Sequence, residues 1–294
     1  MKKVCMTALS ILILTGTSCT GSQKSKIPGV RSETHTTLRT GSVHVYDFGA
    51  LRLHAYNTNG PTGDEVYLLE TGSELIGIES PAFFDSLSEY ADYIASIGKP
   101  LNHLILPYHP AGGETFTNCR VYKTKSAQAA GEEGGSVRAL VDNFIKIFGN
   151  KFAGEIPVAT DIIPDGKNTI GSVEFIVTST ADGFDLEIPA INCVYTHMVG
   201  KNTHNILITA GQIDAMIKQM KGYSAKRYSL ILTTHDAPQT IDSASDKAGY
   251  LGKARELLAA SKTRDEFISQ MKNTFPDYAG EHYLEMSAMA LFPS

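Results

Sequence analysis

The segment Leu101–Gly113 limits the fold of this chain more than any other stretch of its sequence. Its first residues, 101–106, are mostly apolar and predict a buried strand. The strand leads into a Pro- and Gly-rich turn that carries one histidine, His109, at its tip. A polar side chain on a loop just past the carboxyl end of a strand is a common place for chemistry in α/β proteins.

The residues before this segment predict two further elements. Two short apolar runs, 66–69 and 75–78, surround Thr71-Gly72-Ser73 and indicate a β-hairpin. Residues 82–97 then repeat apolar side chains at helical spacing, and Gly98-Lys99-Pro100 ends that helix. The predicted order is therefore hairpin, helix, strand and histidine loop.

This order, with the Gly-Gly pair that follows, resembles the first half of the metallo-β-lactamase-like hydrolases. In that family the loop reads HxHxDH and binds one or two zinc or iron ions. Here it reads Pro107-Tyr108-His109-Pro110-Ala111. With His109 as the second histidine of the motif, Pro107 replaces the first and Ala111 replaces the aspartate. The last histidine falls in a two-residue deletion, so three of the four ligands are missing.

Three later histidines fall on positions that the resemblance directs toward the same cleft. His197 stands where the family has an aspartate that bridges two metals, and His204 follows seven residues later. His235 comes directly after the apolar run 230–233, where the family supplies its last ligand. The resemblance implies that at least three of the four histidines, including His109, bind one zinc or iron ion. The alternative is a relic site without metal, whose histidines only form hydrogen bonds with their neighbours.

Other residues near these positions receive roles from the same resemblance. Asp236 could orient His235 or act as a general base, or it could be an ordinary turn aspartate. Tyr108 and Tyr195 could donate to a developing oxyanion or could pack as aromatic walls. Glu79 matches a family acid that accepts backbone hydrogen bonds beneath the metals, and no catalytic role is inferred for it.

The rest of the pattern predicts an α+β fold of metallo-β-lactamase type, a four-layer αββα sandwich in which two mixed sheets face each other. We expect this domain to cover residues 43–294. Besides the elements already described, strands are expected around Gly49 in 43–56 and at 119–122, 156–163, 173–178, 185–188 and 230–233; helices are expected at 125–130, 137–148, from Thr209, from near Asp246, from Thr263 and at 283–291.

The amino terminus predicts export from a bacterial cell. Residues 1–18 combine two lysines, a short apolar run and small residues, as a signal peptide does. Cys19 at the expected cleavage point would be lipidated and anchor a periplasmic or cell-envelope lipoprotein; secretion without lipid is the alternative. Residues 19–42 are polar and aperiodic and are expected to form a flexible tether.

The charge of the chain limits which partners it can bind, and its cysteine content limits the possible disulfides. Removing the two lysines of the signal peptide changes the formal charge from -5 to -7, and no basic block remains. Nucleic acid is therefore excluded as a partner, and a membrane would be contacted only through the lipid anchor. Cys119 and Cys193 would be the two remaining cysteines without lipid, either paired or, as the favoured alternative, as separate buried thiols.

Two functions fit these observations. The first is an exported metal-dependent hydrolase with an altered, mononuclear, histidine-rich site that acts on an ester, amide or phosphoester. The second is a catalytically inactive lipoprotein of the same fold that binds a small molecule. Both predict a small-molecule partner, and metal in the purified protein would distinguish them.

Overall fold

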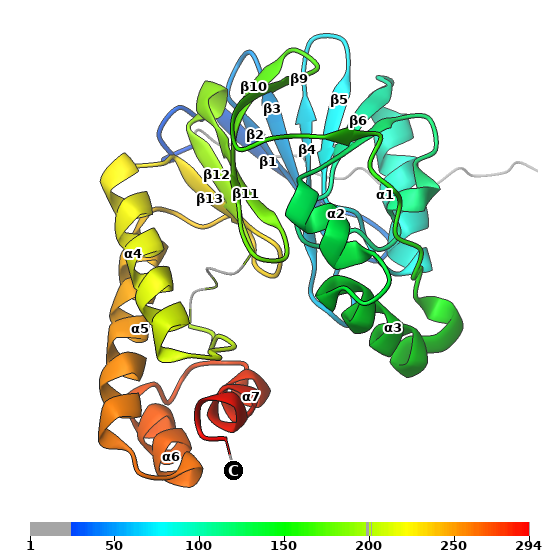
Figure 1. Ribbon diagram of the computed structural model, residues 1–294. Coiled ribbons are helices and arrows are strands. Elements are labelled where there is room, and N and C mark those ends of the chain that lie inside the picture. Colours follow the sequence, from blue (N-terminus) through cyan, green and yellow to red (C-terminus); the bar gives the residue numbers. More distant parts are fainter. Residues whose placement is uncertain (1–24, 198–199, 201, 294) are drawn as a thin grey trace, which may run out of the picture.

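The computed structural model describes residues 25–197, 200 and 202–293, and within them two sheets form the centre of the molecule (Figure 1). The first sheet has eight strands in sequential order: β1 (Ser32–Thr37), β2 (Ser42–Asp47), β3 (Arg52–Asn57), β4 (Glu65–Glu70), β5 (Leu75–Ile78), β6 (Leu101–Ile105), β7 (Arg120–Lys123) and β8 (Asp161–Ile162). Strands β1 to β5 pair antiparallel and β5 to β8 pair parallel, so the sheet is mixed.

The second sheet has five strands in the order β13-β12-β11-β10-β9, which are β9 (Gly166–Ile170), β10 (Val173–Ser179), β11 (Phe184–Ile188), β12 (Cys193–Thr196) and β13 (Leu230–Thr233). Only β12 and β13 pair in parallel. The helix between them, α4, is the crossover that parallel neighbours need. This sheet is therefore mixed as well, as the sequence predicted.

The helices occupy the two outer sides of the paired sheets. They are α1 (Phe84–Ile97), α2 (Lys125–Gly131), α3 (Ser136–Phe148), α4 (Ala210–Lys226), α5 (Asp242–Ala260), α6 (Arg264–Thr274) and α7 (Glu281–Leu291), with short 3-10 turns at Gly113–Thr115, Gly149–Lys151 and Pro189–Ile191. Figure 1 shows α1 to α3 beside the first sheet and α4 to α7 beside the second, with α6 and α7 at the far end. No helix in the described part of the chain is long and apolar enough to cross a membrane.

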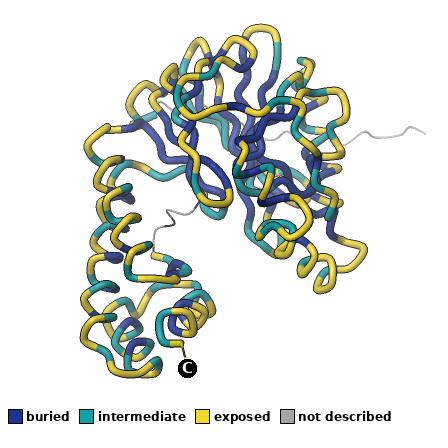
Figure 2. The backbone as a smooth tube through the Cα atoms, in the orientation of Figure 1, coloured by how far each residue is buried: buried dark blue, intermediate teal, exposed yellow. Residues whose placement is uncertain are grey.

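Alternating side chains of the strands produce the four layers. In β12, Cys193 and Tyr195 join the core between the two sheets, whereas Val194 packs with the C-terminal helices. On the first sheet, Tyr56 and Leu68 face helix α1. Figure 2 shows the central strands of both sheets buried and much of the helices exposed. The molecule is thus the predicted αββα sandwich.

Two polar strands were not predicted. The expected tether, residues 19–42, contains β1, which pairs along its whole length with β2, so that prediction is wrong for Ser32–Thr37. Strand β9 forms between the expected strands 156–163 and 173–178, where no strand was predicted. Both are edge strands that gain backbone hydrogen bonds without burying an apolar face, so hydrophobic periodicity does not reveal them.

Two element boundaries differ from the expectations, and the structure also decides whether Cys119 and Cys193 are paired. Only Asp161–Ile162 of the expected strand 156–163 forms a strand, and α5 begins at Asp242 instead of near Asp246. The helices expected from Thr209 and Thr263 form, and the hydroxyls of these two residues accept hydrogen bonds from backbone N–H groups at the starts of α4 and α6. Cys119 and Cys193 are separate thiols; the first is half-buried and the second buried.

Candidate metal site

Three loops bring three histidines together at one edge of the sandwich. His109 follows β6, His197 follows β12 and His235 follows β13. Because β12 and β13 are parallel neighbours, their carboxyl ends meet at the same edge. One ring nitrogen from each histidine lies within 4.8 Å of the other two, close enough to share a metal ion. The predicted convergence of His109, His197 and His235 is confirmed.

Glu79 fixes the loop that carries His109. Its carboxylate accepts backbone hydrogen bonds from Tyr108 N at 2.6 Å and His109 N at 3.0 Å. The hydroxyl of Tyr195 donates to the same carboxylate at 2.7 Å. Glu79 is fully buried and has a φ of 64°, a left-handed conformation that costs a residue other than glycine free energy. The hydrogen bonds expected of Glu79 are therefore present.

The loops of His197 and His235 are tied to each other and to the first sheet. Thr234 N donates to the carbonyl of His197 at 3.1 Å, and Glu65 N of β4 donates to the carbonyl of Thr234 at 2.6 Å. The hydroxyl of Tyr67 reaches across from β4 and donates to the carbonyl of Thr233 at 2.7 Å. These bonds set the distance between the two sheets where the histidines meet.

Asp64 is a residue of the site that the sequence did not reveal. Its Oδ1 lies 3.6 Å from His109 Nδ1 and 3.3 Å from His235 Nδ1, within ion-pair range of both rings. Neither contact has full hydrogen-bond geometry, so among the described residues Oδ1 is a buried acceptor without a hydrogen-bond partner. Its Oδ2 accepts a hydrogen bond from the Thr62 hydroxyl at 2.5 Å.

Asp64 escaped notice because it occupies an ordinary turn sequence. It ends the run Pro61-Thr62-Gly63-Asp64 just before β4, where aspartate is common for local reasons. Its two histidine neighbours lie far along the chain, after β6 and β13. Nothing within its own segment points to them.

Burial and charge act in opposite directions on the groups of the site. Burial alone would raise the pKa of Asp64, but His109 and His235 hold it well below the usual range. Burial alone would lower the pKa of His109, and Asp64 and Glu79 raise it instead. The pKa of His197 is well below its ordinary value, first because of burial and then because of the other two histidines. His197 is therefore the ring most readily kept neutral, as a metal ligand must be.

The two residues predicted as catalytic, Tyr108 and Asp236, lie beside the cluster. The ring of Tyr108 stacks on His197 with centroids 4.9 Å apart, and its hydroxyl donates to Asp185 at 2.8 Å. In this structure Tyr108 thus forms an aromatic wall. Asp236 follows His235 on the same loop, and burial raises its pKa above the ordinary value. Their catalytic roles stay predictions.

His204 does not join the other three histidines in the described structure, so its assignment as a ligand is wrong. It is 1% exposed, and its Nδ1 is paired with the Tyr250 hydroxyl at 3.0 Å. Its ring also contacts Tyr278, and its backbone N donates to the carbonyl of Ala279. His204 lies instead against Tyr250 and Tyr278 of the C-terminal region, and spacing along the sequence does not show that placement.

The donor set fits one divalent ion. His109 Nε2 and His197 Nε2 are 3.1 Å apart. Two nitrogens bound tetrahedrally to one zinc at about 2.0–2.1 Å would lie roughly 3.4 Å from each other, so little movement is needed. Imidazole is a ligand for zinc, iron and nickel. The buried and orphaned Oδ1 of Asp64 is a second sign, because a cation bound nearby would offset its charge.

Solved structures share this architecture. A metallo-β-lactamase family protein from Thermus thermophilus matches 82% of this chain and 91% of its own with a TM-score of 0.59 at 14% identity. The stereoselective inverting sec-alkylsulfatase Pisa1 from Pseudomonas sp. matches 81% of this chain with a TM-score of 0.56 at 14% identity, and this chain spans 48% of that protein. A metallo-β-lactamase from Erythrobacter litoralis matches 74% of this chain and 99% of its own with a TM-score of 0.50 at 11% identity.

The chain has the metallo-β-lactamase fold. The sequence itself matches no family model and no curated protein. At 14% identity or less, the solved structures show the fold alone. The function of this chain therefore has to be inferred from the residues of the chain itself.

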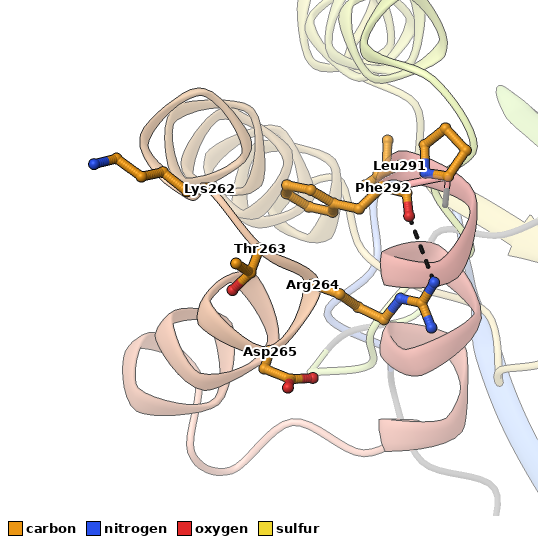
Figure 3. A pocket seen from close by; sticks show the side chains of 7 residues that line it. Lys262, Thr263, Arg264, Asp265, Leu291 and Phe292 are labelled. Carbon is orange, nitrogen blue, oxygen red and sulfur yellow. Dashed lines mark hydrogen bonds between the residues drawn. The ribbon is translucent and has the colours of Figure 1, made fainter.

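Two pockets of the described structure lie away from the three histidines. One lies at the far end of the helical region, where the guanidinium of Arg264 donates to the carbonyl of Phe292 (Figure 3). Another opens on the outer face of the second sheet and includes Asp185 and Tyr223. The second pocket touches the site only indirectly, through the bond between Asp185 and Tyr108.

Proposed function

We propose that this protein binds one divalent metal ion through His109, His197 and His235 and is a metal-dependent hydrolase of an ester, amide or phosphoester. The convergence of one ring nitrogen from each of three loops within 4.8 Å carries the proposal. A bound zinc ion with three protein ligands keeps a position for water and lowers the pKa of that water to about 7.

The residues of the chain would divide the remaining work. His109, His197 and His235 would hold the ion, and Glu79 would keep the His109 loop in place through its two backbone hydrogen bonds. The ring of Tyr108 would cover one face of His197 and exclude water from it. The carboxylate oxygens of Asp236 would accept a proton during hydrolysis, and its raised pKa favours that role near neutral pH.

One ion is proposed instead of two. The position of the family's bridging aspartate holds His197, and an imidazole nitrogen cannot bridge two metals as a carboxylate does. The only carboxylate within ion-pair range of the three rings in the described structure is Asp64, which faces the Nδ1 atoms of two of them.

Elemental analysis of protein purified without chelator tests this function. We expect about one zinc or iron ion per chain, and hydrolysis of a chromogenic ester or phosphodiester that a chelator abolishes. His103→Ala is the matched control for alanine variants of the three clustered histidines. His103 lies on β6 away from the cluster, and its ring bonds the Tyr122 hydroxyl. Absence of metal together with binding of a small molecule would support the alternative, a catalytically inactive binding protein.

A Tyr108→Phe variant separates the two roles of Tyr108. As an aromatic wall, the ring would still stack on His197 and turnover would change by less than about tenfold. As an oxyanion donor, the loss of the hydroxyl would lower turnover by roughly 100-fold or more. We expect the smaller effect because the hydroxyl already donates to Asp185.

We also propose export and anchoring through lipidated Cys19, in the periplasm or cell envelope of a bacterium, with a small molecule as the partner. The signal peptide and Cys19 lie outside the described residues, so the support is the sequence pattern alone. Cys19→Ala followed by cell fractionation tests the anchor. An unchanged distribution between membrane and soluble fractions would contradict it.

A further inference from the structure

We propose that Asp64 is the positioning residue of the candidate metal site: its Oδ1 sets the Nδ1–H tautomer of both His109 and His235 and so leaves the Nε2 atom of each ring able to bind a metal ion. This inference rests on the metal site of the proposed function. It adds a residue from a turn that belongs to none of the three histidine loops.

The neighbours of His235 fix the tautomer of its ring. Its Nδ1 lies 3.2 Å from the backbone carbonyl of Thr62, which can only accept a hydrogen bond. The same Nδ1 lies 3.3 Å from Asp64 Oδ1, which is also an acceptor when ionised. Two acceptors on one side require a proton on Nδ1. The neutral ring then carries its lone pair on Nε2.

For His109, the Asp64 carboxylate is the group that places the proton on Nδ1. Its Nδ1 faces Asp64 Oδ1 at 3.6 Å, and no carbonyl contact to this nitrogen is present among the described residues. Its Nε2 faces His197 Nε2 at 3.1 Å, toward the centre of the cluster. A proton on Nδ1 therefore aims the lone pair of Nε2 at the position that a metal ion would share with His197.

The position of Asp64 makes it a support for the ligands and not a ligand itself. It lies against the Nδ1 atoms, on the opposite side of each ring from Nε2. Metal-bound histidines almost always donate their other ring N–H to a carboxylate, a carbonyl or water, and loss of that partner weakens metal binding by about 10–100-fold. Here one carboxylate serves two rings, and Thr62 holds its other oxygen.

An asparagine would hold the two ring protons less firmly, because it carries no negative charge and has a single acceptor oxygen. Asp64 presents acceptors on two sides: Oδ2 accepts a hydrogen bond from the Thr62 hydroxyl, and Oδ1 lies within ion-pair range of two ring nitrogens. An amide would present an N–H group to one of these two sides. If it faced the rings, both Nδ1 protons would meet a donor, and the tautomers would be driven the wrong way.

The test measures zinc affinity by competition with a chromophoric chelator in three variants. Asp64→Asn should bind zinc about 10–100-fold more weakly than the wild type. Glu65→Gln is the matched control, since Glu65 is the adjacent, equally buried carboxylate and bonds Asn57 instead of a histidine; its affinity should stay within about threefold. Thr62→Val keeps the carbonyl and the carboxylate but removes the hydroxyl, and should have an intermediate effect.

A second readout uses nitrogen-15 NMR of the histidine rings in metal-free protein, with assignments from His109→Gln and His235→Gln. In the wild type both rings should carry their proton on Nδ1. In Asp64→Asn, His109 should lose that preference, whereas His235 should keep it because the carbonyl of Thr62 remains. A merely structural role for Asp64 would not produce this difference between two neighbouring rings.

The two readouts separate the failure of this inference from failure of the proposed function. A wild type that binds no zinc would refute the metal site, and the tautomers would still support or overturn the role of Asp64. A wild type that binds zinc, with Asp64→Asn equal to Glu65→Gln and unchanged tautomers, would overturn the inference alone. If Asp64→Asn fails to fold, Thr62→Val carries both measurements.

Discussion

The histidine cluster at the edge of the sandwich and the buried His204 differ in what their ring nitrogens meet. At the edge of the sandwich, His109, His197 and His235 turn nitrogens toward one another. Beneath the C-terminal helices, His204 turns its Nδ1 to the hydroxyl of Tyr250. The cluster gathers nitrogens without giving each its own protein partner, whereas His204 pairs its ring with a neighbour.

The environment of His204 is a closed polar network. Lys247 donates to the carbonyl of Thr203 at 2.8 Å and to Asn205 Oδ1 at 2.6 Å. The hydroxyl of Ser287 donates to the carbonyl of Asn205 at 2.8 Å. Buried polar groups that are satisfied in this way make a core specific. This network explains His204 without any ligand.

The histidine nitrogens that face one another in the edge cluster lack such a network of partners within the described structure. Among the described residues, the ring of His197 has one polar contact, the 3.1 Å approach of its Nε2 to the Nε2 of His109. Burying polar groups costs free energy unless they are paired. A metal ion would satisfy the three nitrogens at once. The comparison therefore teaches that the partners of a histidine, and not its place in a strand-end loop, separate a candidate ligand from a structural residue.

Replacing one clustered histidine and, separately, His204 should give the largest contrast. His197→Ala removes one of three ligands, and we expect zinc affinity to fall more than about 100-fold, beyond the range for loss of a supporting residue. His204→Ala should leave zinc affinity unchanged and lower the free energy of unfolding by about 1–3 kcal/mol, because the Tyr250 hydroxyl loses the shorter of its two hydrogen bonds.

Chelator competition and denaturant unfolding on both variants check this contrast. Loss of zinc in His204→Ala at unchanged stability would erase the distinction between the cluster and His204. Retention of zinc in His197→Ala would show that the cluster is not the metal site.

The sequence predicted the sandwich because its central strands are marked by local patterns. Strands β4, β5 and β13 are buried along their whole length and read as short apolar runs. The three histidines lie on the loops that follow β6, β12 and β13, so the resemblance could place them. The polar edge strands β1 and β9 carry no apolar run, and they were missed.

The remaining features of the site depend on contacts that no local pattern records. Asp64 sits in a turn whose sequence is explained by the turn itself, and its partners come from other loops. His204 lies on the chain just after a real ligand candidate, yet the backbone carries it to the helices, where its N–H bonds Ala279. Sequence spacing gives proximity along the chain, and side-chain direction comes only from the fold.

Replacing Glu79, which lies beneath the edge cluster, should lower both zinc affinity and the free energy of unfolding. Glu79→Gln leaves one oxygen where two accept hydrogen bonds from Tyr108 N, His109 N and the Tyr195 hydroxyl. We expect the free energy of unfolding to fall by about 1–3 kcal/mol and zinc affinity to fall with it. Glu70→Gln is the control, because Glu70 is also buried but bonds His54 and Lys99.

Denaturant unfolding and zinc competition on these two variants give the result. Glu70→Gln should lose stability and keep its zinc affinity. If Glu79→Gln also kept wild-type zinc affinity, the hydrogen bonds to the His109 loop would be structural only.

The closed network predicts a pH effect that the edge cluster does not share. Burial lowers the pKa of Lys247 from 10.5 to about 8, although Asp236 opposes the shift. Between those values the folded protein has lost a proton that the unfolded chain still holds, so stability rises with pH there. Relative to Lys247→Met, the wild type should gain up to about 3 kcal/mol between pH 8 and 10.5.

Parallel unfolding curves across this pH range measure the gain as a difference between the two proteins, so titrations common to both cancel. A difference that stays flat from pH 8 to 10.5 would mean that Lys247 keeps its proton in the folded state. The polar network would then stabilise the charged amine more than burial penalises it.

The smallest expected effect comes from a single hydroxyl of the closed network. Tyr250→Phe keeps the ring stacked on Tyr278, with centroids 5.3 Å apart, and removes the oxygen that meets His204 Nδ1 at 3.0 Å and Asn205 N at 3.4 Å. One neutral hydrogen bond contributes about 1 kcal/mol, so the melting temperature should fall by roughly 2–4 °C in a chain of this size. Zinc affinity should equal that of the wild type. Calorimetry and chelator competition on the same preparation decide it: a change in zinc affinity at an unchanged melting temperature would couple His204 to the edge cluster and reverse the conclusion that the two are independent.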